Sequence, residues 1–241
     1  MRERPILFRG PMVRAILAGN KTQTRRIVKD PNGLYAHLGQ QSVHPAVSEI
    51  VSCGDGMFRQ TAPEHIKQMY ISTFPCHSLR TPYGQPGDRL WVRETVRPIY
   101  PQDPAYNGGQ PIEYDYAATY RHGSRLGDML GVRRKWTPSI HMPRRACRLM
   151  LEVAGVRVER LNAISEADAM AEGIVRQPDD GFGLADSTHY HATDPRVSFL
   201  GLWEAINGNG SVAANPWVWV IEFRVLASAN NETGGGNGHA A

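Results

Sequence analysis

The chain has few cysteines and no long apolar run. Its 241 residues contain three cysteines, Cys53, Cys76 and Cys147, an odd number at wide spacing. This usage argues against a disulfide framework and favours a reducing compartment. No apolar segment approaches the roughly 20 residues of a membrane span, and no signal-peptide core follows the charged start at residues 1–4. We therefore expect a cytoplasmic protein that does not associate with a membrane.

Metal-ligand motifs are also missing. The sequence contains neither a Cys-x-x-Cys pair nor a His-Glu-x-x-His run. Histidines and cysteines are instead scattered through loop-rich stretches: Cys53, His65, Cys76 and His77 in one, and His189 and His191 in another. Scattered ligands rarely make a zinc site. We expect no metal and no other cofactor.

The charge balance is mildly basic, with 27 lysines and arginines against 23 acidic residues and a net charge of +4. Such a balance permits an anionic partner, such as a nucleotide or RNA, without requiring one. Arginines come in pairs at 25–26, 133–134 and 144–145. If these pairs share a face, they predict a nucleic-acid groove.

Three helices are indicated by their ends and their apolar spacing. Residues 12–17 form a short helix with Pro11 at its first turn and Gly19 just past its end. A second helix opens at Ser165, with Asp168 three residues on as in a capping box, and ends at Gly173. A third carries apolar residues at helical spacing over 197–206.

The strands are predicted from alternation and apolar runs. Residues 89–94, 112–118 and 217–225 read as strands, the last of them central. Residues 147–153 and 156–161 are β-rich, and Ala154–Gly155 between them predicts a hairpin or a tight bend.

The intervening regions, 30–82, 98–131 and 176–195, read as loop-rich insertions, with one short helix near 62–69. The tail 227–241 has almost nothing to bury and is expected to be disordered. We therefore predict one α+β domain over 4–226, a small mixed or antiparallel sheet or barrel flanked by helices.

The densest polar motif follows the first helix, at residues 21–26, which read Lys-Thr-Gln-Thr-Arg-Arg. Such clusters are commonly solvated loops or phosphate-contacting patches. In a helical or turn-like segment, however, Lys21 and Thr24 would face the same side. A lysine beside other cations has a lowered pKa, and a neutral lysine can take a proton from a hydroxyl.

Together with three later segments, this motif resembles the ASCH family, a small β-barrel fold related to the PUA RNA-binding domains. The likeness is carried by ILAGNKTQTRR at 16–26, PGDRLWVRE at 86–94, ISEADAMAEG at 164–173 and NPWVWVIEF at 215–223. The larger phage and prophage members are the most similar, through RPILF at 4–8 and PSIHMP at 138–143. The chain departs from them at Thr81 and Arg145, where such members often carry cysteine and tryptophan.

The resemblance implies an activity. Small bacterial ASCH members hydrolyse the exocyclic amide of N4-acetylcytidine, using a lysine, a threonine and a glutamate. In this chain those positions fall on Lys21, Thr24 and Glu172. Thr24 would be the nucleophile and Lys21 its base, or Lys21 would activate water directly. Glu172 would bind the cytosine amino edge or pass a proton to the leaving amine.

Substrate-binding roles are expected for three further residues. Arg26 is a candidate oxyanion donor, Arg25 would help lower the lysine pKa, and Glu94 can hydrogen-bond the base. The implied partner is an N4-acylated cytidine or a related modified pyrimidine nucleoside, with RNA as an alternative, in the cytoplasm of a bacterial or phage-infected cell.

Two other functions remain open from the sequence. A PUA-like module could read RNA or a modified base without chemistry, with the basic motif contacting phosphate. A phage structural or assembly protein would use the polar insertions and tail for partner contacts.

Overall fold

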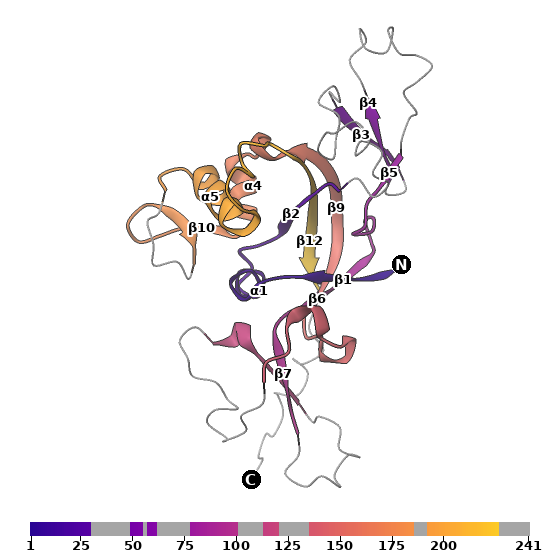
Figure 1. Cartoon of the computed structure of the whole chain (residues 1–241), viewed down its shortest axis with the longest axis vertical. Helices are drawn as coiled ribbons and strands as arrows, with labels where there is room; N and C mark the ends of the chain where they lie inside the picture. The colour runs from indigo at the N-terminus through magenta and orange to yellow at the C-terminus, as the bar shows by residue number, and fades with distance from the viewer. Residues whose placement is uncertain are drawn as a thin grey trace, which may run out of the picture.

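The computed structural model describes residues 1–29, 49–54, 57–61, 78–100, 113–120, 135–185 and 192–226. Over these residues the protein is mixed α+β with more strand than helix, which confirms the predicted class. The strands form open sheets, one of five strands and smaller ones of two or three (Figure 1). No helix in the described ranges is long and apolar enough to cross a membrane.

The five-stranded sheet has the order β1-β6-β9-β12-β2. Its strands are β1 (Glu3–Leu7), β6 (Arg89–Arg93), β9 (Met150–Arg160), β12 (Trp217–Val225) and β2 (Gln23–Ile27). β1 runs parallel to β6, whereas β6–β9, β9–β12 and β12–β2 are antiparallel. The sheet is therefore mixed, with β1 and β2 at its two edges.

β12 is buried on both faces, as its long apolar run predicts. On one face Trp217, Trp219, Ile221 and Phe223 pack with residues of α1 (Gly10–Leu17), β1, β6 and β9. On the other face Val218 and Val220 pack with α4 (Glu166–Ala171) and α5 (Pro195–Asn207). Because alternate side chains of β12 pack into cores on opposite faces of the sheet, the strand lies in its interior.

β9 is one strand of 11 residues, so the predicted hairpin at Ala154–Gly155 is wrong. Its register with β12 pairs Gly155 with Glu222 and Val153 with Phe223, which leaves Ala154 as an extra residue. This is a β-bulge, which bends a strand without reversing it. β9 curves visibly in Figure 1. A small Ala-Gly pair is common to tight turns and bulges, so the sequence did not distinguish them.

The predicted helices are confirmed at α1, α4 and α5. Pro195 stands at the start of α5 behind the cap Asp194. The capping box of α4 is formed as expected, because the Ser165 hydroxyl accepts from the Asp168 N–H while the Asp168 carboxylate accepts from Ser165 N–H. In the described ranges, short 3-10 helices lie at Ala117–Thr119, Ser139–His141, Arg144–Ala146 and Leu161–Ala163.

The regions predicted to be loop-rich insertions contain more strands than the one expected at 112–118, which is confirmed by β8 (Glu113–Tyr116). The other strands in these regions correct the expectation. β3 (Glu49–Gly54), β4 (Met57–Thr61) and β5 (Ser78–Arg80) form one antiparallel sheet. β7 (Val96–Ile99) pairs with β8 (Glu113–Tyr116), and β10 (Ile174–Arg176) with β11 (Phe182–Leu184). These strands are short, and β7 and β11 contain proline or glycine, so their periodicity was weak. The predicted helix near 62–69 and the tail 227–241 lie outside the described residues.

Candidate active site

The segment around Lys21, which follows α1, is hydrogen-bonded to the end of α4. After α1 ends, the N–H of Lys21 donates to the Ala15 carbonyl at 3.1 Å, and that of Thr22 to the Ala171 carbonyl at 2.8 Å. Lys21 and Glu172 form an isolated antiparallel bridge. Glu172 is itself the C-cap residue of α4. Two segments 151 residues apart in sequence are therefore held side by side by backbone contacts.

The side chains of these two residues are also in contact. Lys21 Nζ donates to Glu172 Oε2 at 2.6 Å and to the Glu172 carbonyl at 2.8 Å. Lys21 is 2 % exposed and Glu172 3 %. An amine and a carboxyl that are this close and this dry are able to exchange a proton.

Gly173 makes this close approach sterically feasible. Its φ of +102° lies in the left-handed region. A Cβ at this position would lie 3.2 Å from the Ala15 Cβ and 3.4 Å from the Lys21 Cβ. Glycine therefore ends α4 and lets α1 and Lys21 pack against the turn.

Burial lowers the pKa of Lys21 below its usual 10.5, although Glu172 opposes this by attraction and by hydrogen bonding. Arg26 and Arg25 act in the same direction as burial. The cause is that a charged ammonium loses hydration in the interior. The direction agrees with the requirement for a neutral lysine base.

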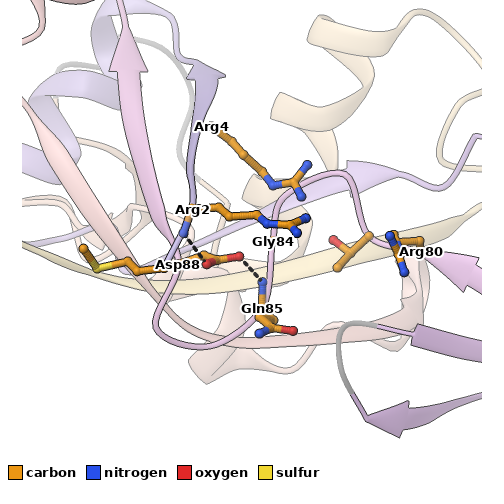
Figure 2. Close-up of a pocket in the computed structure, with 8 residues that line it drawn as sticks. Arg2, Arg4, Arg80, Gly84, Gln85 and Asp88 are labelled. Atoms are coloured by element: carbon orange, nitrogen blue, oxygen red, sulfur yellow. Dashed lines mark hydrogen bonds between the residues drawn. The ribbon is translucent and has the colours of Figure 1, made fainter.

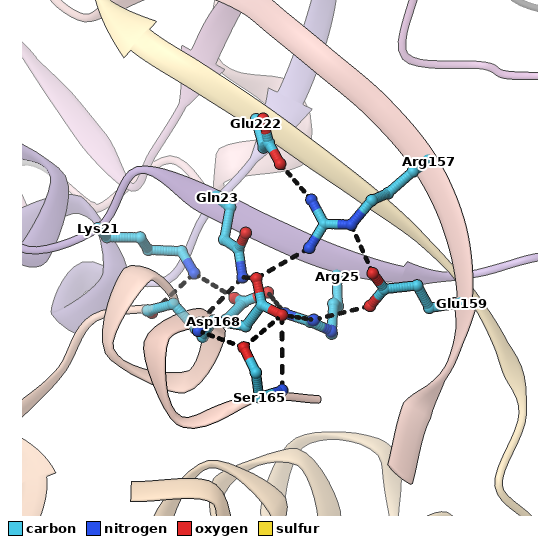
Figure 3. Close-up of polar contacts among 9 residues, drawn as sticks. Lys21, Gln23, Arg25, Arg157, Glu159, Ser165, Asp168 and Glu222 are labelled. Carbon is cyan, nitrogen blue, oxygen red and sulfur yellow. Dashed lines mark hydrogen bonds and ion pairs between the residues drawn. The ribbon is translucent and has the colours of Figure 1, made fainter. Parts of the chain in front are cut away.

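Arg25, which is itself buried, connects Glu172 to a partly exposed ionic network. Figure 3 shows Arg25 among Asp168, Glu159 and Arg157. The Arg25 guanidinium lies 3.3 Å from Glu172 Oε1, 3.0 Å from Glu159 Oε2 and 3.3 Å from Asp168 Oδ2. Arg157 on β9 binds Glu159, Asp168 and Glu222 in turn. Glu172 is therefore shared between Arg25 and Lys21, which fixes its orientation.

Asp168 is the centre of this network on the α4 side. It accepts hydrogen bonds from the Ser165 hydroxyl at 2.8 Å, Gln23 Nε2 at 3.0 Å and Arg157 Nη2 at 2.8 Å. Although burial acts in the opposite direction, these hydrogen bonds and the attraction of Arg25 and Arg157 lower the pKa of Asp168 to about 2. The helix that carries Glu172 is thus clamped to β2 and β9.

Thr24 lies on strand β2. The predicted placement of Thr24 beside Lys21 assumes a helical or turn-like segment. The segment is extended rather than helical, so neighbouring side chains alternate between faces. Gln23 and Arg25 face the carboxylates of α4, and Thr24 and Arg26 belong to the other face. The expectation that Lys21 and Thr24 share a side through helical spacing is therefore wrong. In the described part of the chain no hydrogen bond joins Lys21 Nζ to Thr24.

Lys21 and Thr24 nevertheless line the same cavity, because β2 is an edge strand and the cavity lies along it. The cavity has a volume of about 600 Å³. Its lining includes Lys21, Thr24, Arg25, Arg26 and Glu172 among the expected residues, and Leu7, Phe8, Tyr83, Leu202 and Trp203 among others. It is large enough for a small-molecule ligand.

Arg26 and Tyr83 give the cavity a polar and aromatic wall. Arg26 Nη2 donates to the Leu7 carbonyl at 2.6 Å, and its guanidinium lies 5.2 Å from the centre of the Phe8 ring. Burial lowers the pKa of Arg26, opposed by Tyr83 and Glu172. Burial raises the pKa of Tyr83, opposed by Arg26. A guanidinium and two rings at one wall suit a planar polar ligand.

Glu94 does not line this cavity, although the next residue, Thr95, does. It is 1 % exposed, and its two oxygens accept from Arg148 Nε at 2.8 Å and Nη2 at 2.9 Å. The Arg148 guanidinium in turn lies 4.0 Å from the centre of the Tyr116 ring. Glu94 is not among the residues that line the cavity with Lys21. The structure therefore brings five of the six expected site residues together and leaves Glu94 in a separate buried ion pair.

Several residues of the site were not found from the sequence. Gln23, Arg157 and Glu159 belong to the network, and Phe8 and Trp203 to the cavity. The alternation of Arg157 and Glu159 on a strand was a weak signal of a shared charged face. Of the arginine pairs considered above, Arg25 is buried in the network, and 133–134 lie outside the described residues.

Within the described ranges, no group of three or more histidine, cysteine or acidic side chains is arranged to hold a metal ion. The cysteines and histidines considered above at 65, 76, 77, 189 and 191 lie outside those ranges. Comparisons of the chain with models of protein families, with curated proteins and with solved structures found no match.

Proposed function

We propose that the protein is an amidohydrolase that cleaves the exocyclic amide of N4-acylated cytidine or cytosine, releasing the amine and a carboxylate. The observation that carries this proposal is the buried 2.6 Å contact between Lys21 and Glu172 at the wall of a cavity that Thr24 also lines. A phosphate-binding or structural loop has no need of a desolvated amine paired with a carboxyl in a cavity that a hydroxyl also lines.

In the proposed reaction, Lys21 passes its proton to Glu172 and becomes a neutral base. It then takes the hydroxyl proton of Thr24 as Thr24 Oγ1 bonds to the acyl carbon. The bond from the acyl carbon to N4 breaks, and N4 leaves with a proton returned through the Lys21–Glu172 pair. Water hydrolyses the acyl-threonine. In the variant pathway Lys21 activates water directly, and Thr24 only orients it.

Two cavity-lining residues support a polar ligand. Arg25 Nε and Trp203 Nε1 are buried donors without a hydrogen-bond partner among the described residues. A buried donor left unpaired costs about 1–3 kcal/mol. A carbonyl or ring nitrogen of a bound pyrimidine that accepted from either donor would recover part of that cost.

The ASCH resemblance and its PUA-like barrel belong to the same proposal, as does a cytoplasmic location. β1 and β2 are the edges of the five-stranded sheet, and the hydrogen bond from Arg26 on β2 to the Leu7 carbonyl on β1 links them. This link supports a sheet that curls towards closure.

The test is hydrolysis of N4-acetylcytidine, followed by the ultraviolet change as cytidine forms. We expect turnover by the wild-type chain and its loss in Lys21→Ala and in Thr24→Val, with folding checked by circular dichroism. An acetyl group found on Thr24 by mass spectrometry would favour the acyl-threonine pathway. Full activity in either variant would end the assigned roles.

An RNA-binding module without chemistry is the second candidate. Trp91 on β6 is half-buried, with the guanidinium groups of Arg93 and Arg144 at 5.3 and 5.8 Å from its ring. Aromatic and arginine groups of this kind favour base stacking. Salt-dependent RNA binding with no hydrolysis of any N4-acylated cytidine would select this candidate over the enzyme.

A further inference from the structure

A second cleft, separate from the Lys21 cavity, is lined by arginines. Its volume is about 250 Å³, and Arg2, Arg4 and Arg80 contribute to it together with residues of the 81–88 turn. Figure 2 shows Arg2 and Arg4 extending in the same direction above Gly84, with Arg80 on the other side. Three guanidinium groups around one small cleft repel one another unless an anion lies among them.

These arginines are not neutralised by neighbouring acids. Arg2 and Arg80 have no carboxylate within ion-pair distance among the residues described. Arg4 Nη1 donates to the Pro82 carbonyl at 3.3 Å, whereas its Nε is buried and unpaired within the same ranges. The cleft therefore keeps donors available for a ligand.

Asp88, the acid of the cleft, is already occupied by the backbone. Its Oδ1 accepts from the Arg2 N–H at 2.7 Å and its Oδ2 from the Gln85 N–H at 3.3 Å. Despite burial, which acts against it, these backbone bonds and the attraction of the N-terminal amine and of Arg4 lower the pKa of Asp88. Asp88 thus ties the start of β1 to the turn, and its single charge is shared with Arg4, while Arg2 and Arg80 have no carboxylate partner among the described residues.

The arginine cleft neighbours the Lys21 cavity along two shared segments. β1 carries Arg4 to the cleft and Leu7 to the cavity, a separation of about 10 Å at the usual rise of a strand. The turn carries Gln85 to the cleft and Tyr83 to the cavity. A ligand that spans both sites would place a flat base near Tyr83 and a negative group at the arginines.

We propose that the arginine cleft binds a phosphate group of the nucleotide or RNA strand that carries the base held in the Lys21 cavity. Guanidinium groups match phosphate oxygens through paired N–H donors. This inference rests on the proposed function for the identity of the base. The phosphate contact itself can be tested without any hydrolysis.

The experiment measures binding of a fluorescent single-stranded cytidine-rich RNA, and separately of cytidine 5′-monophosphate, over a range of salt concentrations. The test variant is Arg2→Gln/Arg80→Gln, which retains the half-buried Arg4. The matched control is Arg176→Gln/Arg196→Gln, which removes the same charge from exposed arginines that pair with Asp180 and Asp194. Thermal unfolding checks that both variants remain folded.

We expect the test variant to bind RNA about tenfold more weakly at low salt and to lower the log–log salt slope by about 0.7, the change for one lost phosphate contact. The control should bind as the wild type does. Weakened binding of the mononucleotide alone would support a terminal phosphate instead of a chain phosphate. Wild-type affinity of the test variant for both ligands would overturn the proposal, and so would an equal loss in the control.

Hydrolysis of the uncharged nucleoside N4-acetylcytidine separates this inference from the proposed function. If both hold, the test variant hydrolyses the nucleoside at the wild-type rate while losing RNA affinity. If the wild-type chain hydrolyses nothing, the proposed function fails, and the binding measurement still decides the phosphate site.

Discussion

Replacing Asp168 with asparagine removes the central charge of the network that clamps α4 to the sheet. The carboxyl has a pKa of about 2 in the folded chain against 3.8 for the free group. This difference corresponds to about 2 kcal/mol of stability at neutral pH. Asparagine keeps the size of the side chain and part of its hydrogen bonding, so most of the loss is expected to be electrostatic.

The pH dependence follows from the sign of this change. A carboxyl whose pKa is lowered by folding stabilises the folded state fully above the unfolded pKa, and this stabilisation is lost as the pH falls through the folded pKa. The deficit of Asp168→Asn should therefore be complete above about pH 5, about half as large at pH 3, and nearly absent below about pH 2.

Urea unfolding of the wild type and of Asp168→Asn, from neutral pH down to about pH 3, measures the deficit. Glu166→Gln is the matched control, since Glu166 lies on the same helix, is 65 % exposed and sits 3.8 Å from Arg196. It should cost less than about 0.5 kcal/mol. Equal midpoints for the two variants at neutral pH, or a deficit of Asp168→Asn that stays constant with pH, would refute the reasoning.

Three further predictions concern the site and its surroundings. Gly173→Ala should destabilise the fold by about 2 kcal/mol, and by more than Gly19→Ala does. Both glycines have a positive φ, but of the two only Gly173 has neighbouring atoms close to the position of an added Cβ. Urea unfolding midpoints of the two variants test this difference. The kcat/KM for N4-acetylcytidine should rise with pH and level off below 10.5, because burial lowers the pKa of Lys21 and only the neutral amine accepts a proton. A plateau reached only at or above pH 10.5 counts against this base. Glu94→Gln should cost about 3 kcal/mol in urea unfolding, because Arg148 loses the negative charge that it pairs with. KM should be unchanged, and a raised KM would return Glu94 to the substrate site.

The sequence predicts a structural feature correctly where that feature depends only on residues close together in the chain. The capping box at Ser165, the glycine that ends α4 and the apolar run of β12 each depend on neighbouring residues, and each was predicted correctly. The reading of Ala154–Gly155 failed because one short motif serves two structures, and only pairing with β12 selects the bulge.

The site itself depends on contacts that no local pattern contains. The sequence named Lys21, Thr24 and Glu172, but only the tertiary structure decided that Lys21 meets Glu172 at the end of α4 while Thr24 projects from an extended edge strand. It also moved Glu94 from the cavity to Arg148 and surrounded Arg25 with three carboxylates. The physical reason is that charge pairing and desolvation depend on distance in space, and residues 151 positions apart become neighbours only when the chain has folded.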